Sequence, residues 1–222
     1  MSAMLFDIDG TLVDSNYLHV QAWSEALQRA DRAAVDDWRI HRCIGMGGPQ
    51  LIAELLGEVD DADEQRISTL HSRHYRKLAH RLRRFDGARE VLQAVHDRGV
   101  RVVLATSAAP AELKLLLDVL DPGDAVDAVT SADDVDAAKP EPDLLQVALR
   151  KVDAAPADAI LVGDATWDGI SAARAGVRFV GVRTGGTSAA DLVAAGAQAV
   201  YTDVAHLLAE LPTSPIATLT AG

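Results

Sequence analysis

The sequence contains a single cysteine, Cys43, among its 222 residues. One thiol cannot form an internal disulfide, and its isolation excludes a zinc site built from several thiolates. We therefore expect Cys43 to behave as a small buried apolar residue rather than as a redox or metal centre.

Basic residues are outnumbered: 21 Lys and Arg face 33 Asp and Glu, so the formal net charge is −12. Nucleic acids and anionic membranes are bound largely through Lys and Arg, so this balance argues against both as partners. The acidic surface also favours a monomer, because like charges repel.

Long apolar runs are absent as well, since no stretch reaches 18 apolar residues and no transmembrane helix is expected. The first nine residues carry charges early and lack a basic start, so we expect no secretory signal peptide and a cytoplasmic location. The apolar share of 49% is nevertheless enough for a sizeable core. The length predicts one large domain, or one domain with an insertion.

Short apolar runs alternate with helical stretches from residue 85 onward, which predicts a doubly wound, Rossmann-like α/β fold with a parallel sheet. The runs are continuously apolar, as expected of strands that helices cover on both faces. The predicted strands are Met4–Ile8, Val100–Thr106, Ala128–Ser131, Ala159–Gly163, Phe179–Val182 and Ala199–Tyr201. The predicted helices between them are Ala88–Arg98, Ala111–Leu120, Asp143–Lys151, Asp168–Ala175 and Ala189–Ala195.

Residues 16–84 show helical periodicity and no convincing strand; one stripe is Tyr17, Val20, Trp23, Ala26 and Leu27. The block is too long for an ordinary crossover between the first two strands. We interpret it as a helical cap subdomain inserted into a core domain of residues 1–15 and 85–222. The end of the chain, residues 212–222, is expected to fray.

The first predicted strand leads into Asp7-Ile8-Asp9-Gly10-Thr11. Alternation along an extended chain points Asp7 and Asp9 to the same side. Two crowded carboxylates repel each other unless a cation or phosphate chemistry uses them. Gly10 permits a tight turn and a close approach of its amide to a ligand.

Polar residues follow later predicted strands in the same way. Thr106 ends the second strand, where a hydroxyl and free helix amides can bind an anion, although capping a helix is the commoner role. Lys139 stands in a loop that Pro140 stiffens. Asp164 lies at a strand end and Asp168 four residues later, so that both can face one hard cation. Ligands of open parallel sheets bind outside the carboxyl ends of the strands, and these residues all fall there.

The chain resembles the haloacid dehalogenase superfamily, in particular the branch that holds β-phosphoglucomutase and phosphoglycolate phosphatase. The resemblance covers nearly the whole chain, from Met4 to about Leu211. The four motifs that carry it, in order, are the segment from Asp7 to Ser15, Thr106, Lys139-Pro140 and Gly163-Asp164 with Asp168.

The resemblance implies a catalytic cycle. Asp7 would attack phosphorus to form an aspartyl-phosphate, and Asp9 would protonate the leaving alcohol and later activate water. Mg²⁺ would be held by Asp7, the backbone carbonyl of Asp9 and Asp164, with Asp168 as a direct or indirect ligand. The phosphoryl oxygens would be bound by Thr106 and Ser107, with Gly10 and Lys139. Lys139 would also offset negative charge and hold Asp7.

Members of the superfamily differ in activity, so the fold alone does not choose among them. Haloacid dehalogenases lack a carboxylate at the position of Asp9, and a phosphonatase would need a cap lysine, for which Lys77 stands in a poor, strongly basic context. The mutase alternative is weakened because the loop from Gly45 to Pro49 lacks an arginine for a second phosphate. We therefore favour a phosphatase of a small phosphomonoester, with a phosphosugar mutase and a catalytically idle binding module as alternatives.

Three cap residues are further candidates for contact with the substrate or the Asp9 loop: His19, Arg42 and Gly45. His19 is equally compatible with a plain polar position on the first cap helix. The loop around Gly45 is equally compatible with a simple turn. A basic run is interpreted as a solvated helix face or as a guide for an anion; it comprises His71, Arg73, His74, Arg76, Lys77, His80, Arg81, Arg83 and Arg84.

Overall fold

The computed structural model describes residues 1–32, 34–135 and 138–219. Its centre is a six-stranded parallel sheet in the order β5-β4-β1-β6-β7-β8. The chain fills one side of β1 first and then returns to fill the other, so β1 lies between β4 and β6. The strands are β1 (Ala3–Phe6), β4 (Arg101–Ala105), β5 (Ala128–Thr130), β6 (Ala159–Gly163), β7 (Arg178–Val182) and β8 (Ala197–Tyr201).

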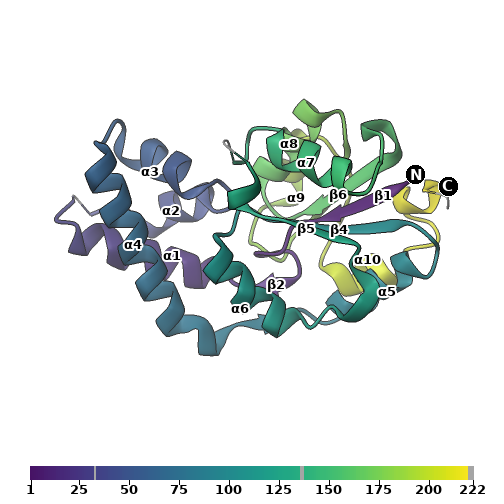
Figure 1. Cartoon of the computed structure of the whole chain (residues 1–222), viewed down its shortest axis with the longest axis horizontal. Helices are drawn as coiled ribbons and strands as arrows, with labels where there is room; N and C mark the ends of the chain where they lie inside the picture. Colours follow the sequence, from purple (N-terminus) through teal and green to yellow (C-terminus); the bar gives the residue numbers. More distant parts are fainter. Residues whose placement is uncertain (33, 136–137, 220–222) are drawn as a thin grey trace.

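Helices cover both faces of this sheet, as Figure 1 shows. Side chains alternate along β1, so that Met4 and Phe6 join one core and Ala3 and Leu5 join the other. The first face is covered by α5 (Ala88–His96), α6 (Pro110–Leu120) and α10 (Val204–Ala209). The second face is covered by α7 (Asp143–Lys151), α8 (Thr166–Ala175) and α9 (Ala189–Ala194). This doubly wound α/β arrangement confirms the predicted fold class.

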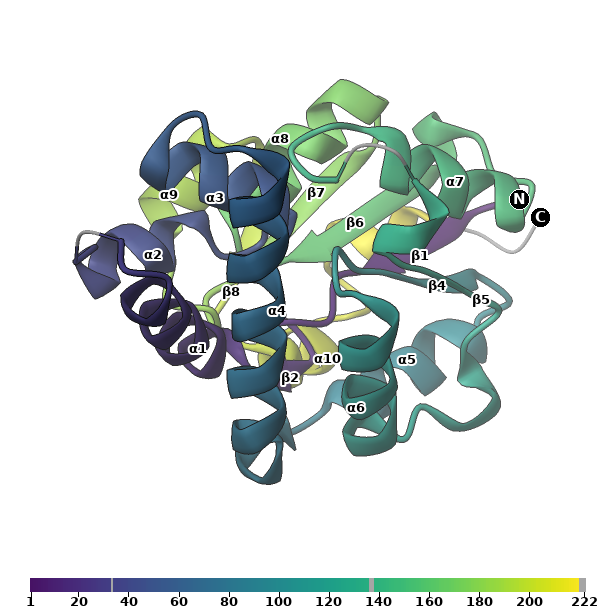
Figure 2. The same cartoon turned by 60° about the vertical axis from the view of Figure 1, so that its left-hand side comes forward.

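Four helices gather beyond the carboxyl ends of the strands, at the left of Figure 1. They enclose a hydrophobic cluster of their own, which includes Trp23, Leu27 and Ile52. Figure 2 shows the longest of them, α4, running across the front of the molecule beside α6. The helices are α1 (Asn16–Arg29), α2 (Asp37–Cys43), α3 (Gly48–Leu56) and α4 (Asp61–Leu78). No helix in the described ranges is both long enough and apolar enough to cross a membrane.

The chain enters and leaves this helical block through a small antiparallel pair of strands, β2 (Val13–Asp14) and β3 (Arg83–Arg84). The guanidinium of Arg83 lies 2.9 Å from the Asp14 carboxylate across the pair. The prediction that residues 16–84 contain no strand is therefore wrong at Arg83 and Arg84. Two residues are too few to produce a recognisable hydrophobic pattern, and these two are charged and exposed.

Other differences concern positions where tertiary packing overrides the local pattern. Helix α10 was not predicted, although its Val204 and Leu207 are fully buried. Tyr17 does not belong to the buried stripe of α1; it is 59% exposed and stacks on the His41 ring. Cys43 is buried, as its expected apolar role requires.

The expectation of a frayed end is wrong up to residue 219. A short 3₁₀ helix spans Pro215–Thr218, and Ile216 and Leu219 belong to the core on the α5 and α10 side of the sheet. Apolar residues scattered among Pro, Ser and Thr have no clear period, which is why the sequence did not indicate this packing. Residues 220–222 of the predicted frayed segment lie outside the described part.

Replacing Ile216 with alanine tests the packing of this segment. Ile216 is 2% exposed, and removing its buried methyl and methylene groups should lower the free energy of unfolding by about 2–4 kcal/mol in a urea titration. Thr213→Ala, at an exposed position of the same segment, should change it by less than about 0.5 kcal/mol. Equal, negligible effects of both substitutions would show that the segment does not pack.

Candidate active site

Three neighbouring strand ends bring polar residues together at one edge of the sheet. Asp7 follows β1, Thr106 follows β4 and Asp164 follows β6, and these strands lie side by side. The amide of Asp7 still donates to the Val162 carbonyl at 2.9 Å, so the ladder fixes where the loop begins. The predicted convergence at the carboxyl edge is thus present in the structure.

Lys139 reaches this edge from the loop after β5 and is completely buried. Its Nζ lies 2.5 Å from Asp7 Oδ1 and 2.8 Å from Asp168 Oδ1, and it also donates to the Ala105 carbonyl at 3.2 Å. A buried ammonium is stable only when such partners replace its water. Opposite charge raises the pKa of Lys139 against the effect of its burial, so the side chain stays charged.

Asp164 is held from two sides. Its Oδ1 accepts from Thr11 Oγ1 and its Oδ2 accepts from Asn16 Nδ2, each at 2.8 Å. Gly10, whose φ is +72°, has Asp164 Oδ2 2.5 Å from the place of a Cβ, and a Cβ on Gly185 would collide with the same carboxylate. Glycine at both positions therefore leaves the room that this carboxylate occupies.

The carboxylates of Asp7, Asp164 and Asp168 offer oxygens that all lie within 4.8 Å of one another. Burial raises the pKa of Asp7 well above its usual range, and burial together with Asp168 raises the pKa of Asp164 to about 7. Three buried acids thus share one buried ammonium, and their negative charge is only partly offset. Hard oxygen ligands with surplus negative charge fit a divalent cation such as Mg²⁺.

Asp9 lies beside this group and is bonded differently. Its Oδ1 accepts from Ser15 Oγ at 2.6 Å and faces His19 Nε2 at 3.1 Å, while Thr106 Oγ1 lies 3.4 Å from its Oδ2. Burial alone would raise the pKa of Asp9, but the bonds from His19 and Ser15 outweigh it and lower the pKa. To protonate a leaving group, Asp9 must first hold a proton. Because the pKa of Asp9 is lowered, that proton has to come from the pair that Asp9 forms with His19.

A cavity of about 220 Å³ opens over Asp7, Asp9 and Thr106; we call it the main cavity. Its helical side includes His19 and Gly45, which the sequence indicated. Ser107 also lines it, and Ser107 Oγ is buried with no hydrogen-bond partner among the described residues. An unsatisfied buried hydroxyl favours a polar ligand here.

Two predicted substrate contacts are placed elsewhere. Arg42 lines a neighbouring cavity on the far side of Asp164, where its backbone carbonyl accepts a bond from Trp167 Nε1. The Gly10 amide donates to the Val13 carbonyl at 2.8 Å, and therefore closes a turn instead of meeting a ligand. Sequence spacing cannot indicate which side of a loop an arginine lies on.

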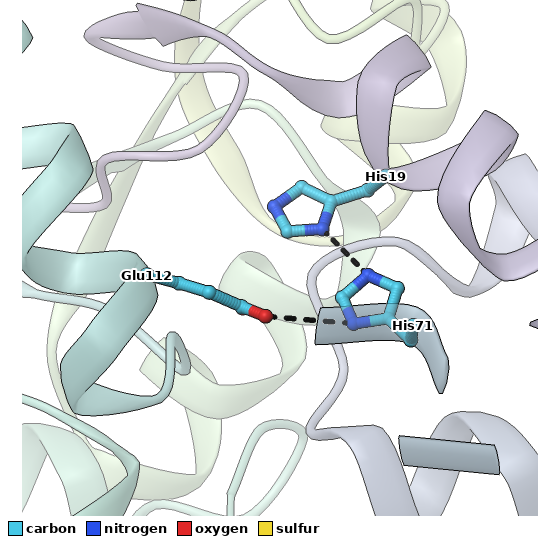
Figure 3. A group of neighbouring side chains, drawn as sticks. All are labelled: His19, His71 and Glu112. Carbon is cyan, nitrogen blue, oxygen red and sulfur yellow. Dashed lines mark hydrogen bonds and ion pairs between the residues drawn. The ribbon is translucent and has the colours of Figure 1, made fainter. Parts of the chain in front are cut away.

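A row of side chains continues from Asp9 into the helical block, and Figure 3 shows its inner part. His19 Nδ1 lies 3.1 Å from His71 Nε2 on α4, and His71 Nδ1 lies 3.5 Å from Glu112 Oε1 on α6. One set of protonation states satisfies every contact: His19 donates to Asp9 and His71, and His71 donates to Glu112. The pKa shifts agree in direction, since burial lowers the pKa of His71, and bonding to Asp9 raises that of His19 despite its burial.

The sequence analysis missed Asn16, His71 and Glu112 as site residues. His71 was grouped with a basic, solvated run, yet His71 is 4% exposed. Glu112 is a single acid in the first turn of α6, where a charge that favours the helix N-terminus is the ordinary interpretation. Asn16 directly follows the first motif. Its position next to this acidic segment was the only feature of the sequence that could have indicated a role in the site.

Comparisons with known proteins identify the family of the chain. The family model described as haloacid dehalogenase-like hydrolase matches residues 4–182. A phosphoglycolate phosphatase of Rhodospirillum rubrum is 32% identical over 217 residues, which cover 92% of this chain and 88% of that protein. A phosphorylated carbohydrates phosphatase of Thermotoga maritima is 29% identical, with coverage of 90% and 94%.

Among solved structures, a hydrolase from Pseudomonas syringae superposes with a TM-score of 0.91 at 34% sequence identity. The match covers 96% of this chain and 99% of the other. Fold and sequence similarity therefore extend over both the sheet and the helical block.

Lys139→Met tests the role of the buried ammonium. The substitution leaves two buried carboxylates without their counter-charge and should lower the free energy of unfolding by about 3–5 kcal/mol, measured in urea without divalent ions. Lys151→Met is the matched control, because Lys151 pairs with Asp134 at the surface and should contribute at most about 1 kcal/mol. A loss at Lys139 no larger than that at Lys151 would contradict the assignment.

Proposed function

Because this chain belongs to the haloacid dehalogenase-like hydrolases, we propose that it is a Mg²⁺-dependent phosphatase that cleaves small phosphomonoesters through an aspartyl-phosphate on Asp7. Its relatives carry the names of phosphatases of phosphoglycolate and of phosphorylated carbohydrates. The proposal includes the sequence-based predictions of a small-molecule partner, a monomer and a cytoplasmic location.

The observation that supports the nucleophile best is the unequal use of the two Asp7 oxygens. Oδ1 is held by Lys139, whereas Oδ2 has no hydrogen-bond partner in the described part of the chain, and Asp7 lines the main cavity. A carboxylate fixed by one oxygen presents the other in a single orientation, which lowers the entropic cost of attack. Thr106 and Ser107 lie in the same cavity, where their hydroxyls can bind phosphoryl oxygens.

The metal would be held by Asp7 and Asp164, whose facing oxygens and incompletely offset charge suit it. When bound, Mg²⁺ offsets the negative charge of the phosphoryl group and of the attacking carboxylate. Asp168 Oδ1 faces the cationic Lys139 Nζ at 2.8 Å, whereas the partners of Asp164 are the uncharged Thr11 hydroxyl and Asn16 amide. Asp168 is therefore better suited to orienting Lys139 than to binding the ion directly.

Asp9 and His19 would hold the proton that the leaving oxygen takes up. Asp9 Oδ1 and His19 Nε2 lie 3.1 Å apart, so a proton held between them is available on the cavity side of Asp9. Loss of that proton to the leaving alcohol restores the carboxylate, which can then take a proton from the water that attacks the aspartyl-phosphate.

Residues 16–84 would act as a cap over the core of residues 1–15 and 85–222. Polar contacts join the two parts around the site: His41 Nε2 donates to the Gly185 carbonyl at 2.7 Å, and Ser72 Oγ donates to Glu112 Oε1 at 2.9 Å. Opening of the cap would have to break these bonds together with those of His19 to Asp9 and of Trp167 to the Arg42 carbonyl. Closure would exclude water from the acid–base step, and opening would release product.

The two alternative functions have less support. A phosphosugar mutase must bind a second phosphate, yet neither Lys nor Arg appears among the described residues that line the main cavity. A catalytically idle module would have no need for Asp7, Asp9, Lys139 and Asp164 at one edge of the sheet. Conversion of β-glucose 1-phosphate to glucose 6-phosphate without release of phosphate would favour the mutase.

The experiment that tests this function is phosphate release from para-nitrophenyl phosphate. Release should require Mg²⁺ and stop in EDTA, and Asp7→Asn should reduce kcat by at least about 10³-fold, because an amide is a poor nucleophile. Circular dichroism should show that the variant remains folded. Asp14→Asn, at a half-buried acid of the same segment that pairs with Arg83 outside the cavity, is the control for the loss of one charge. Undiminished turnover by folded Asp7→Asn protein would contradict the assignment.

A further inference from the structure

One residue of the main cavity, Glu112, has no part in the proposed steps. It stands in the first turn of α6, opposite α4, and its side chain is only 7% exposed. Oε1 accepts from Ser72 Oγ and lies 3.5 Å from His71 Nδ1, whereas Oε2 has no hydrogen-bond partner among the described residues. A largely buried carboxylate thus has one oxygen fixed and one left unused in the wall of a cavity.

Burial raises the pKa of the Glu112 carboxyl, whereas the charge of His19 and the bond from Ser72 act in the opposite direction and favour the ionised form. Two donors point to Oε1, and the N-terminus of α6 lies close by, where a helix favours negative charge. An unused carboxylate oxygen in a nearly closed site loses its water when the site fills. It therefore needs a donor from whatever molecule occupies the cavity.

Among the described residues, no side-chain cation at this end of the cavity is free to pair with an anion. No Lys or Arg of the described ranges lines it, and its remaining acids are Asp7 and Asp9. The two imidazoles have no free N–H, because His19 bonds to Asp9 and His71, and His71 bonds to Glu112. A carboxylate or second phosphate on the substrate would face Glu112 with no unpaired cation of the described residues beside it, and such a contact between like charges is unfavourable.

Most of the rest of the wall is apolar, including Trp23, Ile44, Met46 and Leu51, although the serine Ser68 also lines it. The volume of about 220 Å³ lies below the range of about 300–1,000 Å³ typical of sites for drug-sized ligands. The space therefore suits a short carbon chain that carries one or more hydroxyl groups.

Building on the proposed function, we propose that Glu112 selects the alcohol part of the substrate. The enzyme takes phosphate monoesters of small neutral alcohols whose hydroxyl donates to Glu112 Oε2. It discriminates against esters that carry a carboxylate or a second phosphate at that end. Glu112 is thus a specificity-determining residue that lies on the core and meets the substrate where α4 covers it.

A matched pair of substrates tests the proposal: glycerol 3-phosphate and 3-phosphoglycerate. The two share a three-carbon skeleton and differ by a hydroxymethyl group in place of a carboxylate. The proposal predicts a kcat/KM at least about 100-fold higher for glycerol 3-phosphate, because the carboxylate meets an unpaired like charge. Propyl phosphate, which lacks hydroxyls, should be at least about 10-fold poorer than glycerol 3-phosphate.

Glu112→Gln should weaken the preference for glycerol 3-phosphate over 3-phosphoglycerate. Glutamine keeps the shape and an acceptor for Ser72, but it removes the charge and can turn an amide donor to the cavity. The ratio of the two kcat/KM values should fall at least about 10-fold. Partial misfolding lowers both values equally and leaves their ratio unchanged. Asp118→Asn, an exposed acid on the same helix, should keep the wild-type ratio.

The outcomes distinguish failure of the proposed phosphatase function from failure of the inference about Glu112. Absence of phosphate release from every ester, para-nitrophenyl phosphate included, contradicts the proposed function and this inference with it. Release from para-nitrophenyl phosphate with equal kcat/KM for glycerol 3-phosphate and 3-phosphoglycerate contradicts the inference alone. An unchanged ratio in Glu112→Gln also contradicts it.

Discussion

The fully buried ammonium of Lys139 is the interaction on which the site depends. It lies between the carboxylates of Asp7, in the loop after β1, and Asp168, in the first turn of α8, which follows the adjacent strand β6. Without this cation, acids brought together by the parallel sheet would repel one another in a medium that screens charge poorly. The ion pairs also fix one oxygen of Asp7 and leave the other directed to the cavity side. In the proposed function, one side chain would thus both compensate charge and orient the nucleophile.

The sheet positions the acidic residues of the site, and the helical block encloses the main cavity beside them. Asp9 is the residue where the two meet, since its carboxylate is bonded from the first motif by Ser15 and from α1 by His19. From His19 the contacts continue through His71 to Glu112, which returns the row to the core. In the proposed function Asp9 would be nearest the leaving oxygen and Glu112 nearest the far end of the alcohol, and buried polar contacts connect the two. A substrate that fills the cavity would touch both ends of this row.

The sequence predicted the fold class and most residues at the sheet edge because both arise from local patterns. Apolar runs mark strands, and Asp7, Thr106 and Asp164 stand directly after them, so the parallel topology alone brings them together. Lys139 lies in a loop after another strand, and the order of motifs was the only signal for it. The boundaries of β6 and α7 matched, whereas α10 and the segment around Ile216 are short and lack a periodic pattern.

The residues that line the far side of the cavity were not predictable in this way. His71 and Glu112 lie 41 residues apart on two helices, and only the docking of α4 against α6 makes them neighbours. Helical periodicity distinguishes a buried from an exposed face of a helix. His71 belongs to a run so rich in Arg and Lys that the buried face of α4 could not be recognised there. Arg42 is the opposite case, since a basic residue beside a glycine loop suggested a substrate contact and the chain directs it to a different cavity. Pairings between distant helices depend on packing that no local pattern contains.

The central claim is that Asp7 forms a covalent bond to phosphorus. The stereochemical course at phosphorus tests it most directly, by turnover of a phosphate ester made chiral with oxygen isotopes. Two successive in-line displacements, first by Asp7 and then by water, each invert the configuration. The account predicts net retention in the transferred phosphoryl group, as measured with an alcohol acceptor in place of water. Net inversion would mean a single direct displacement and would contradict it.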